Sequence, residues 1–188
     1  MRVIIILVSS ILMLSCGSAD KVIAPTAESM AVEEWVNQKN FQVDVEWAYP
    51  LTTSALNSFA NSGFFPPGSS VGSVNLINNP SFVRMKGGEV EMYLPYYGER
   101  QLAGEYNANK GGIEFKGVPT RFKIVKNEKK QRHVMTFYID NNKESNKVVL
   151  TFFPNQVVSI NVNSSHRTPI SYRGTIEALK EDKVTGVD

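Results

Sequence analysis

Hydrophobic and polar residues alternate along most of the chain from residue 41 onward. In the segment FQVDVEWAY the hydrophobic residues occupy every second position: Phe41, Val43, Val45, Trp47 and Tyr49. A two-residue period with β-branched and aromatic side chains is typical of a half-buried β-strand. The sequence therefore predicts a strand here, with these five residues on one face.

The same period recurs in short segments down to the C-terminus. The predicted strands are SVNLI (73–77), SFVRMKG (81–87), EVEMYLP (89–95), GIEFKG (112–117), TRFKIVK (120–126), RHVMTFYID (132–140), KVVLTFF (147–153), QVVSINVNS (156–164) and PISYRGTIEAL (169–179). Short strands with turn residues about every ten positions are typical of antiparallel β proteins. We therefore expect a mainly β fold, with a single antiparallel meander that forms a small barrel or sandwich.

Two segments that flank the first strand lack this period. In ESMAVEEWVNQKN (28–40), apolar residues recur at spacings of three and four, which predicts a short N-terminal amphipathic helix anchored by Trp35. Residues 50–72 are rich in Ser, Gly, Asn and Pro, which argues against a central strand. Within them the pair Phe64-Phe65 is expected to fold back onto the domain as a lid or plug.

The first sixteen residues have the pattern of a secretion signal. Arg2 precedes an apolar run, Val3–Leu14, and Cys16, the sole cysteine, follows directly. Roughly 12 apolar residues fit the signal-peptide range and fall short of the roughly 20 of a membrane-spanning helix. The pattern resembles a bacterial lipoprotein signal, in which Cys16 is acylated and becomes the first residue. Met13 departs from the usual Leu, and an ordinary secretory signal is the alternative.

These patterns divide the chain into four parts. Residues 1–15 form a lipoprotein signal peptide, 16–28 a tether, 29–180 a single β domain and 181–188 a C-terminal tail. The expected location is the bacterial cell envelope. There a lipid anchor on Cys16 would hold the protein on a membrane, facing the periplasm or the cell exterior.

Charge and composition exclude several classes of protein. The net charge is +2 over 188 residues, so we expect no nucleic-acid partner. The two histidines, His133 and His166, are expected to face solvent at a strand end and in a turn. Without a cysteine or an HExxH spacing they do not indicate a metal site. The chain has no GxSxG motif, which argues against a serine hydrolase. Its Gly-Gly pairs do not precede a predicted helix, as a phosphate-binding loop would, and we expect no cofactor.

Paired carboxylates are the best candidates for catalysis in this sequence. Asp44 and Glu46 lie two residues apart on one predicted strand, as do Glu89 and Glu91 on another. Such a spacing of about 6.6–7 Å overlaps the separation of the two acids in inverting glycosidases, about 6.5–9.5 Å. Every polar strand face with alternating acids produces this spacing, so a solvated face is the favoured interpretation.

The only dense basic run is KIVKNEKKQRH, residues 123–133. It coincides with a predicted hairpin turn, where Lys and Arg keep strand edges soluble. Contact with phosphate-bearing lipid headgroups or acidic glycans is the alternative.

The segment EMYLPYYGERQLAGEY (91–106) combines a strand pattern with a proline and two tyrosines. Pro95 has no backbone N–H to donate, so we expect it to end the strand or to lie on an edge strand. Tyr96 and Tyr97 then point in opposite directions, with Tyr97 the more exposed. A structural corner is the favoured interpretation, and a rim that stacks on sugar rings or aromatic ligands is the second. The candidate ligand-binding residues are Phe64, Phe65, Tyr96 and Tyr97.

Several of these segments together resemble a known family. NFQVDVEWAYP is followed by VEMYLPYYG, GGIEFKG and a terminal ISYRGTI, behind a signal-like N-terminus. That order resembles, over roughly residues 30–178, the lipoprotein family of Bacteroides-type bacteria catalogued as domain of unknown function 4251. The resemblance implies an all-β, extracytoplasmic protein without an established activity, so it transfers no catalytic residues.

Three functions remain open at this point. The leading one is a non-enzymatic envelope lipoprotein that binds a small apolar or glycan ligand, or an envelope protein, on a β scaffold. The second is a hydrolase that acts on polysaccharide through acids such as Asp44 and Glu46. The third is a structural or assembly role through an exposed sheet edge.

Overall fold

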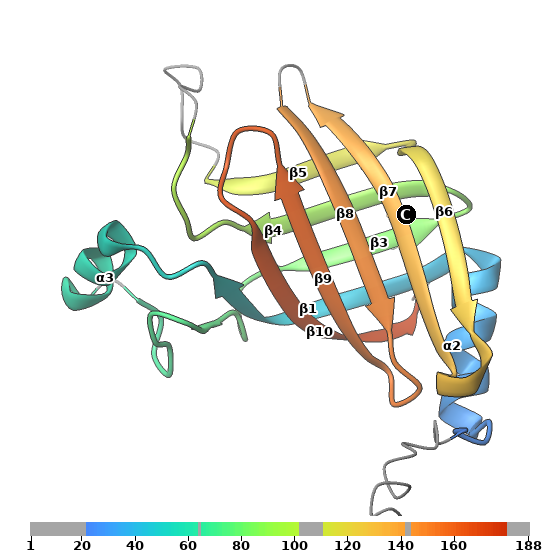
Figure 1. Cartoon of the computed structure of the whole chain (residues 1–188). Helices are drawn as coiled ribbons and strands as arrows, with labels where there is room; N and C mark the ends of the chain where they lie inside the picture. Colours follow the sequence, from blue (N-terminus) through green and yellow to red (C-terminus); the bar gives the residue numbers. More distant parts are fainter. Residues whose placement is uncertain (1–21, 64, 102–110, 142–143, 180–188) are drawn as a thin grey trace, which may run out of the picture.

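The computed structural model describes residues 22–63, 65–101, 111–141 and 144–179, and its strands form one antiparallel sheet that curls into a half-barrel (Figure 1). This confirms the expected mainly β fold. The strands are β1 (Asn40–Pro50), β2 (Val74–Asn75), β3 (Phe82–Lys86), β4 (Glu89–Pro95), β5 (Gly112–Gly117), β6 (Thr120–Asn127), β7 (Arg132–Asn141), β8 (Glu144–Phe152), β9 (Val157–Ser164) and β10 (Ile170–Ala178).

The first and last strands pair at the centre of the sheet. The strand order is β5-β4-β3-β1-β10-β9-β8-β7-β6, and the short β2 also pairs with β1. Phe41 on β1 lies opposite Ala178 on β10, and Val43 lies opposite Ile176. Two runs of consecutive hairpins extend from this central pair. Because β5 and β6 follow each other in the chain, their short connection joins the two edges of the curled sheet.

The core lies on the concave face of the half-barrel. Alternate residues of the strands are buried there, among them Val43, Met85, Met92, Met135, Leu150, Ile160 and Tyr172. The intervening residues lie on the convex face and are half-buried or exposed. Burial on one face explains the two-residue period of the sequence.

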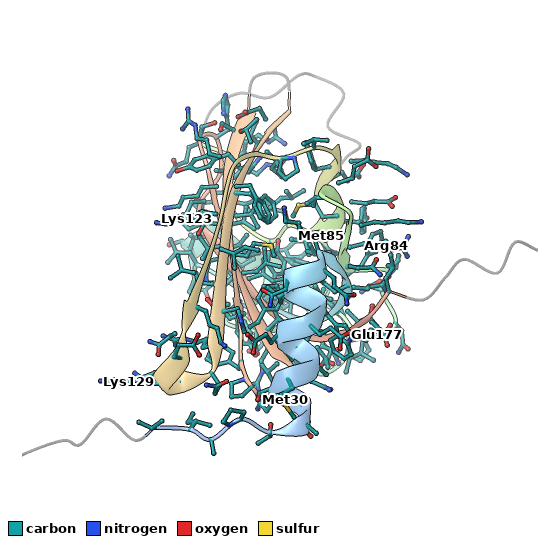
Figure 2. The ribbon with its side chains drawn as sticks, turned by 90° about the vertical axis from the view of Figure 1, so that its right-hand side faces the viewer. Met30, Arg84, Met85, Lys123, Lys129 and Glu177 are labelled. Carbon is teal, nitrogen blue, oxygen red and sulfur yellow. The ribbon has the colours of Figure 1, made fainter. Side chains whose placement is uncertain are left out.

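Helix α2 (Ala27–Gln38) packs against the central strands β1 and β10, and its Glu33 forms an ion pair with Lys126 of the edge strand β6; Figure 2 shows the helix from the side. Its start is fixed by a capping box, in which Thr26 and Ser29 exchange side-chain-to-backbone hydrogen bonds. Val32 and Val36 are buried, and Trp35 packs partly buried against the core. The predicted amphipathic helix is therefore present, although its first residues lie inside the stretch assigned to the tether.

The alternation along β1 breaks at a β-bulge. The pairing with β10 steps from Val45 opposite Gly174 to Trp47 opposite Arg173, so Glu46 is the extra residue. Ala48 is consequently buried, whereas Tyr49 is exposed and Trp47 half-buried. The expectation that Trp47 and Tyr49 share the face of Phe41 and Val43 was wrong, because the bulge shifts the period by one residue.

The expected exposure of the two histidines was wrong for His133. Its side chain is only 3% exposed, and neither ring nitrogen has a hydrogen-bond partner among the residues described. The pattern places His133 on the core face of β7, two residues before Met135. Burial lowers the pKa of this imidazole, and the nearby charge of Glu33 opposes that shift only in part.

Two further observations concern the described ranges as a whole. None of their helices combines the length and the apolar character that crossing a membrane requires. Nor do these ranges contain three or more His, Cys, Asp or Glu side chains grouped closely enough to hold a metal ion.

Candidate functional site

A second helix, α3 (Ser54–Asn61), lies beyond the end of β1 and was not predicted. The Oγ1 atom of Thr53 accepts a hydrogen bond from the Leu56 N–H at 3.2 Å and so caps the helix. Leu56 is the buried residue of α3. The signal in the sequence was a capping threonine with Leu56 and Phe59 three residues apart. The Ser, Gly and Pro residues that follow obscured it.

Aromatic rings join α3 to the segment after β4. The ring of Phe65 lies 5.5 Å from that of Phe59 and 6.2 Å from that of Tyr97, both edge to face. Phe65 also packs against the core, so the predicted folding back of this residue is observed. Phe64 lies outside the described residues. The structure thus brings together three of the four predicted ligand-binding residues, Phe65, Tyr96 and Tyr97.

Between α3 and the tyrosine segment is a pocket with a volume of about 360 Å³. It is lined by Thr53, Ala55, Leu56, Phe59, Tyr96, Tyr97, Gly98 and Glu99. The lining includes three aromatic residues, Phe59, Tyr96 and Tyr97. Its polar residues are these two tyrosines, Thr53 and the acidic Glu99. We call this space the aromatic pocket. Its size is at the lower end of the range of small-molecule sites, roughly 300–1,000 Å³.

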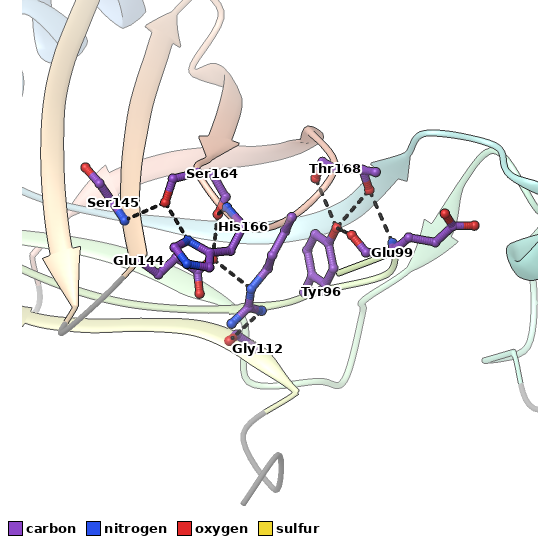
Figure 3. Close-up of polar contacts among 10 residues, drawn as sticks. Tyr96, Glu99, Gly112, Glu144, Ser145, Ser164, His166 and Thr168 are labelled. Carbon is purple, nitrogen blue, oxygen red and sulfur yellow. Dashed lines mark hydrogen bonds and ion pairs between the residues drawn. The ribbon is translucent and has the colours of Figure 1, made fainter. Parts of the chain in front are cut away.

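Tyr96 lines the aromatic pocket, and Figure 3 shows the polar contacts that hold its hydroxyl in place. Its Oη atom lies 2.8 Å from Thr168 Oγ1 and 3.0 Å from the Thr168 carbonyl oxygen. The Glu99 N–H donates to the same Oγ1 at 3.3 Å. A Cβ on Gly98 would lie 2.5 Å from Tyr96 Oη, so glycine leaves room for this network. Tyr96 is therefore held by the loop between β9 and β10.

Arg167 supports Tyr96 from the side of the sheet. Its guanidinium lies 5.1 Å from the centre of the Tyr96 ring, and its Nη1 donates to the Gly112 carbonyl oxygen at 3.2 Å. Its Nε lies 2.8 Å from Glu144 Oε1, which also accepts a hydrogen bond from Ser164 Oγ (Figure 3). Because both charged groups are largely buried and paired, Arg167 connects β5, β8 and the pocket wall.

The ionisable groups around the pocket have defined charge states. Burial raises the pKa of both Tyr96 and Tyr97, so both phenols are protonated at neutral pH. Burial alone would raise the pKa of Glu144. Hydrogen bonds from Ser164 and Arg167, together with the Arg167 charge, outweigh that effect and lower it. The two tyrosines that line the pocket are therefore uncharged. The ion pair between Arg167 and Glu144 lies behind Tyr96.

The sequence did not indicate Thr168 and Arg167 as parts of this site. They lie about 70 residues after Tyr96, and no local pattern links a turn threonine to a distant tyrosine. The exposure of Tyr97 predicted from the sequence is matched only in part, since Tyr96 and Tyr97 are both half-buried.

The paired carboxylates lie away from the aromatic pocket. Asp44 and Glu46 line a hollow of about 480 Å³ on the convex face, beside residues 76–82. Asp44 accepts a hydrogen bond from Gln42 at 2.6 Å, and Glu46 accepts one from Thr175 at 3.0 Å.

The second pair of carboxylates, on β4, lies on the surface. Glu91 lies within 3.7 Å of Arg84 and 3.5 Å of Lys116, and Glu89 is exposed. No contact described here tests catalysis by either pair, so the hydrolase remains a prediction.

The histidine in the turn between β9 and β10, His166, is half-exposed. Its Nδ1 lies 2.7 Å from the Oγ of the adjacent Ser165, and its backbone N–H donates to Ser164 Oγ at 3.0 Å. These local contacts order the turn that carries Arg167 and Thr168.

The fold and the pocket define a class of protein: a single curled antiparallel sheet, with one helix at its edge and an aromatic pocket beyond its central strand. Within that class the chain belongs to the family described as "Domain of unknown function (DUF4251)", whose model matches residues 25–176. The expected family resemblance is thereby confirmed.

A solved structure shares this fold. It is the crystal structure of a DUF4251 family protein from Bacteroides eggerthii, which is 11% identical in sequence and superposes with a TM-score of 0.53. The match covers 82% of this chain and 89% of the other. No curated protein matches this chain.

Proposed function

We propose that this protein is a lipid-anchored envelope protein that binds a small ligand in the aromatic pocket without catalysing a reaction. The observation that supports binding most strongly is the pocket itself. Phe59, Tyr96, Tyr97 and Glu99 are among its lining residues, and the ring of Phe65, which is not part of the lining, contacts both Phe59 and Tyr97. The anchor is supported by the signal-like leader and by the position of Cys16, which lies outside the described residues.

The chemistry of the lining favours a ligand with a flat apolar face and polar edges. Aromatic rings present apolar faces, on which the C–H groups of a sugar ring can stack. Glu99, Thr53 and the Tyr97 hydroxyl supply polar groups near those faces. A glycan fragment of one or two sugar rings fits this combination and the volume of about 360 Å³. The acidic side chain of Glu99 favours a neutral ligand over an anionic one, and the protonated phenols can donate hydrogen bonds to the hydroxyl groups of a sugar.

Thermal shift measurements with a panel of disaccharides test the proposal. The panel contains cellobiose, maltose, mannobiose and chitobiose, each titrated against the full chain. We expect at least one to raise the midpoint of unfolding in a saturable manner, since ligand binding to the folded state stabilises it. The Tyr97→Ala variant should lose this shift, whereas Tyr138→Ala on β7 should retain it. No shift with any disaccharide, or an equal shift in Tyr97→Ala, would contradict the proposed site.

A further inference from the structure

One end of the domain carries exposed apolar and basic side chains close together. Val22, Ile23 and Met30 are 66%, 38% and 56% exposed. Lys129 and Lys130 are exposed on the 3-10 turn η2 (Glu128–Lys130), between β6 and β7. We call these five residues the basal surface. Figure 2 shows Met30 and Lys129 at the same end of the molecule.

A backbone hydrogen bond connects the two halves of the basal surface. The Ile23 N–H donates to the Lys129 carbonyl oxygen at 2.8 Å. The chain that enters the domain therefore passes directly against the hairpin tip. Lys126 on the same hairpin forms ion pairs with Glu33 of α2 at 2.7 Å and with Glu128 at 2.9 Å. These contacts fix the hairpin tip relative to α2 and the entering chain.

The basal surface lies near the predicted lipid attachment point. Cys16 lies six residues before Val22, and six residues can span at most about 20 Å. A lipid on Cys16 would consequently hold Val22 within about that distance of the membrane surface. The hairpin tip with Lys129 and Lys130 would be held near the membrane as well, because the Ile23 N–H is hydrogen bonded to the Lys129 carbonyl oxygen.

The aromatic pocket lies at the opposite end of β1. Helix α2 immediately precedes this strand and α3 follows it, on opposite sides of the sheet in Figure 1. Eleven residues at about 3.3 Å each separate the two ends by roughly 30 Å or more. The pocket therefore lies well apart from the basal surface.

We infer that the basal surface rests on a phospholipid membrane, with Val22, Ile23 and Met30 inserted among the headgroups. This inference rests on the lipid anchor of the proposed function. Exposed apolar side chains beside lysines are typical of surfaces that lie in the membrane interface. Acidic residues lie at the same end, since Glu28 is in the first turn of α2 and Glu128 begins η2. The charge is therefore nearly balanced, and apolar contact supplies most of the binding.

Fluorescence quenching on vesicles tests this orientation. The full chain is purified from a bacterial membrane and reconstituted in vesicles of phosphatidylethanolamine and phosphatidylglycerol, some carrying a nitroxide on the headgroup. A fluorophore is attached at Met30→Cys or, as a matched control, at the exposed Ser58→Cys on α3. We expect the nitroxide to quench the Met30→Cys label at least twofold more than the Ser58→Cys label, with little change in high salt.

A second variant separates apolar contact from simple tethering. Val22→Asp with Ile23→Asp keeps Cys16 and the backbone hydrogen bond of residue 23, and it should reduce quenching of the Met30→Cys label to the level of the control. Unchanged quenching of the Met30→Cys label in this variant would overturn the insertion of the apolar side chains into the membrane.

Mass spectrometry of the N-terminus distinguishes the two proposals. An acylated Cys16 with equal quenching at both labels would overturn the orientation alone. A chain without an acyl group would overturn the anchor and the orientation together.

Discussion

The hydroxyl of Tyr172 on β10 donates a hydrogen bond to the carbonyl oxygen of Pro95 on β4, at 2.9 Å. Strands β3 and β1 separate β4 from β10 in the sheet, so this bond crosses the concave face. Tyr172 is only 1% exposed, and burial raises its pKa well above the ordinary value, which keeps the donor protonated. The bond joins two of the four segments on which the family resemblance rests, VEMYLPYYG and ISYRGTI.

Replacing Tyr172 by Phe should destabilise the fold. The Pro95 carbonyl oxygen would lose its partner, and an unsatisfied buried acceptor costs about 1–3 kcal/mol. Urea unfolding at pH 7 measures the change in the free energy of unfolding. The exposed Tyr49→Phe is the matched control and should change it by less than about 0.5 kcal/mol. Equal effects of both substitutions would show that the cross-sheet bond contributes nothing.

Gly174→Ala should be more harmful than an ordinary glycine substitution. Its Cβ would collide with the Asp44 carbonyl oxygen at the bulge of β1, and this backbone atom has no rotamer to relieve the contact. We expect a loss of about 1–3 kcal/mol or more in the free energy of unfolding. Gly72→Ala, with open space around the new Cβ, is the control. A Gly174→Ala protein as stable as Gly72→Ala would mean that the two central strands are spaced differently.

The edge-to-face contact between Phe65 and Tyr97 should appear as an energetic coupling. A double-mutant cycle with Phe65→Ala and Tyr97→Ala is expected to give a coupling of about 0.5–1.5 kcal/mol in urea unfolding. Phe65→Ala combined with Tyr138→Ala should be additive, because Phe65 lies between α3 and β2, beside the central strand β1, whereas Tyr138 lies on β7, next to the edge strand β6. A coupling of zero for the first pair would show that the contact between the Phe65 and Tyr97 rings contributes nothing to stability.

His133 should make the fold less stable in mild acid. Burial lowers its pKa below the ordinary 6.5, with opposing effects from Glu33 and Glu128 and a supporting one from Lys126. The unfolded chain therefore binds the proton first. Stability is fully present above about pH 6.5 and is lost as the pH falls from 6.5 towards the lower folded value.

The comparison of wild type with His133→Leu between pH 8 and pH 5 measures this effect. The variant should lose less stability over that range, because it has no buried imidazole to protonate. An identical pH dependence of the two proteins, or an NMR titration of His133 with a midpoint above 6.5, would contradict the buried neutral histidine.

The sequence indicated the strands well because most of them have one buried face and one that is more exposed. In EVEMYLP the alternation of Val90, Met92 and Leu94 with polar residues corresponds directly to the concave and convex faces. The same reasoning failed at Glu46, where a bulge inserts one residue. Nothing local in the sequence marks that insertion. The bulge lies opposite Gly174 on another strand, where a Cβ would collide with the Asp44 carbonyl oxygen.

The candidate site was predictable only in part for a similar reason. Tyr96 and Tyr97 stand out in the sequence because they follow Pro95 at the end of a strand. What holds Tyr96 is Thr168, which comes close only after the sheet has curled. The sequence also proposed Phe65 for the site, yet without α3 it could not indicate Phe59 as the ring against which Phe65 packs.

NMR spectroscopy of the aromatic rings tests the ligand-binding account most directly. Ring proton–carbon spectra of the full chain are recorded during titration with the disaccharide that gives the largest thermal shift, or with chitobiose if none does. The account predicts saturable changes concentrated at Phe59, Phe65, Tyr96 and Tyr97, and their disappearance in Tyr97→Ala. Spectra that stay unchanged up to millimolar sugar, or that change equally in Tyr97→Ala, would contradict it.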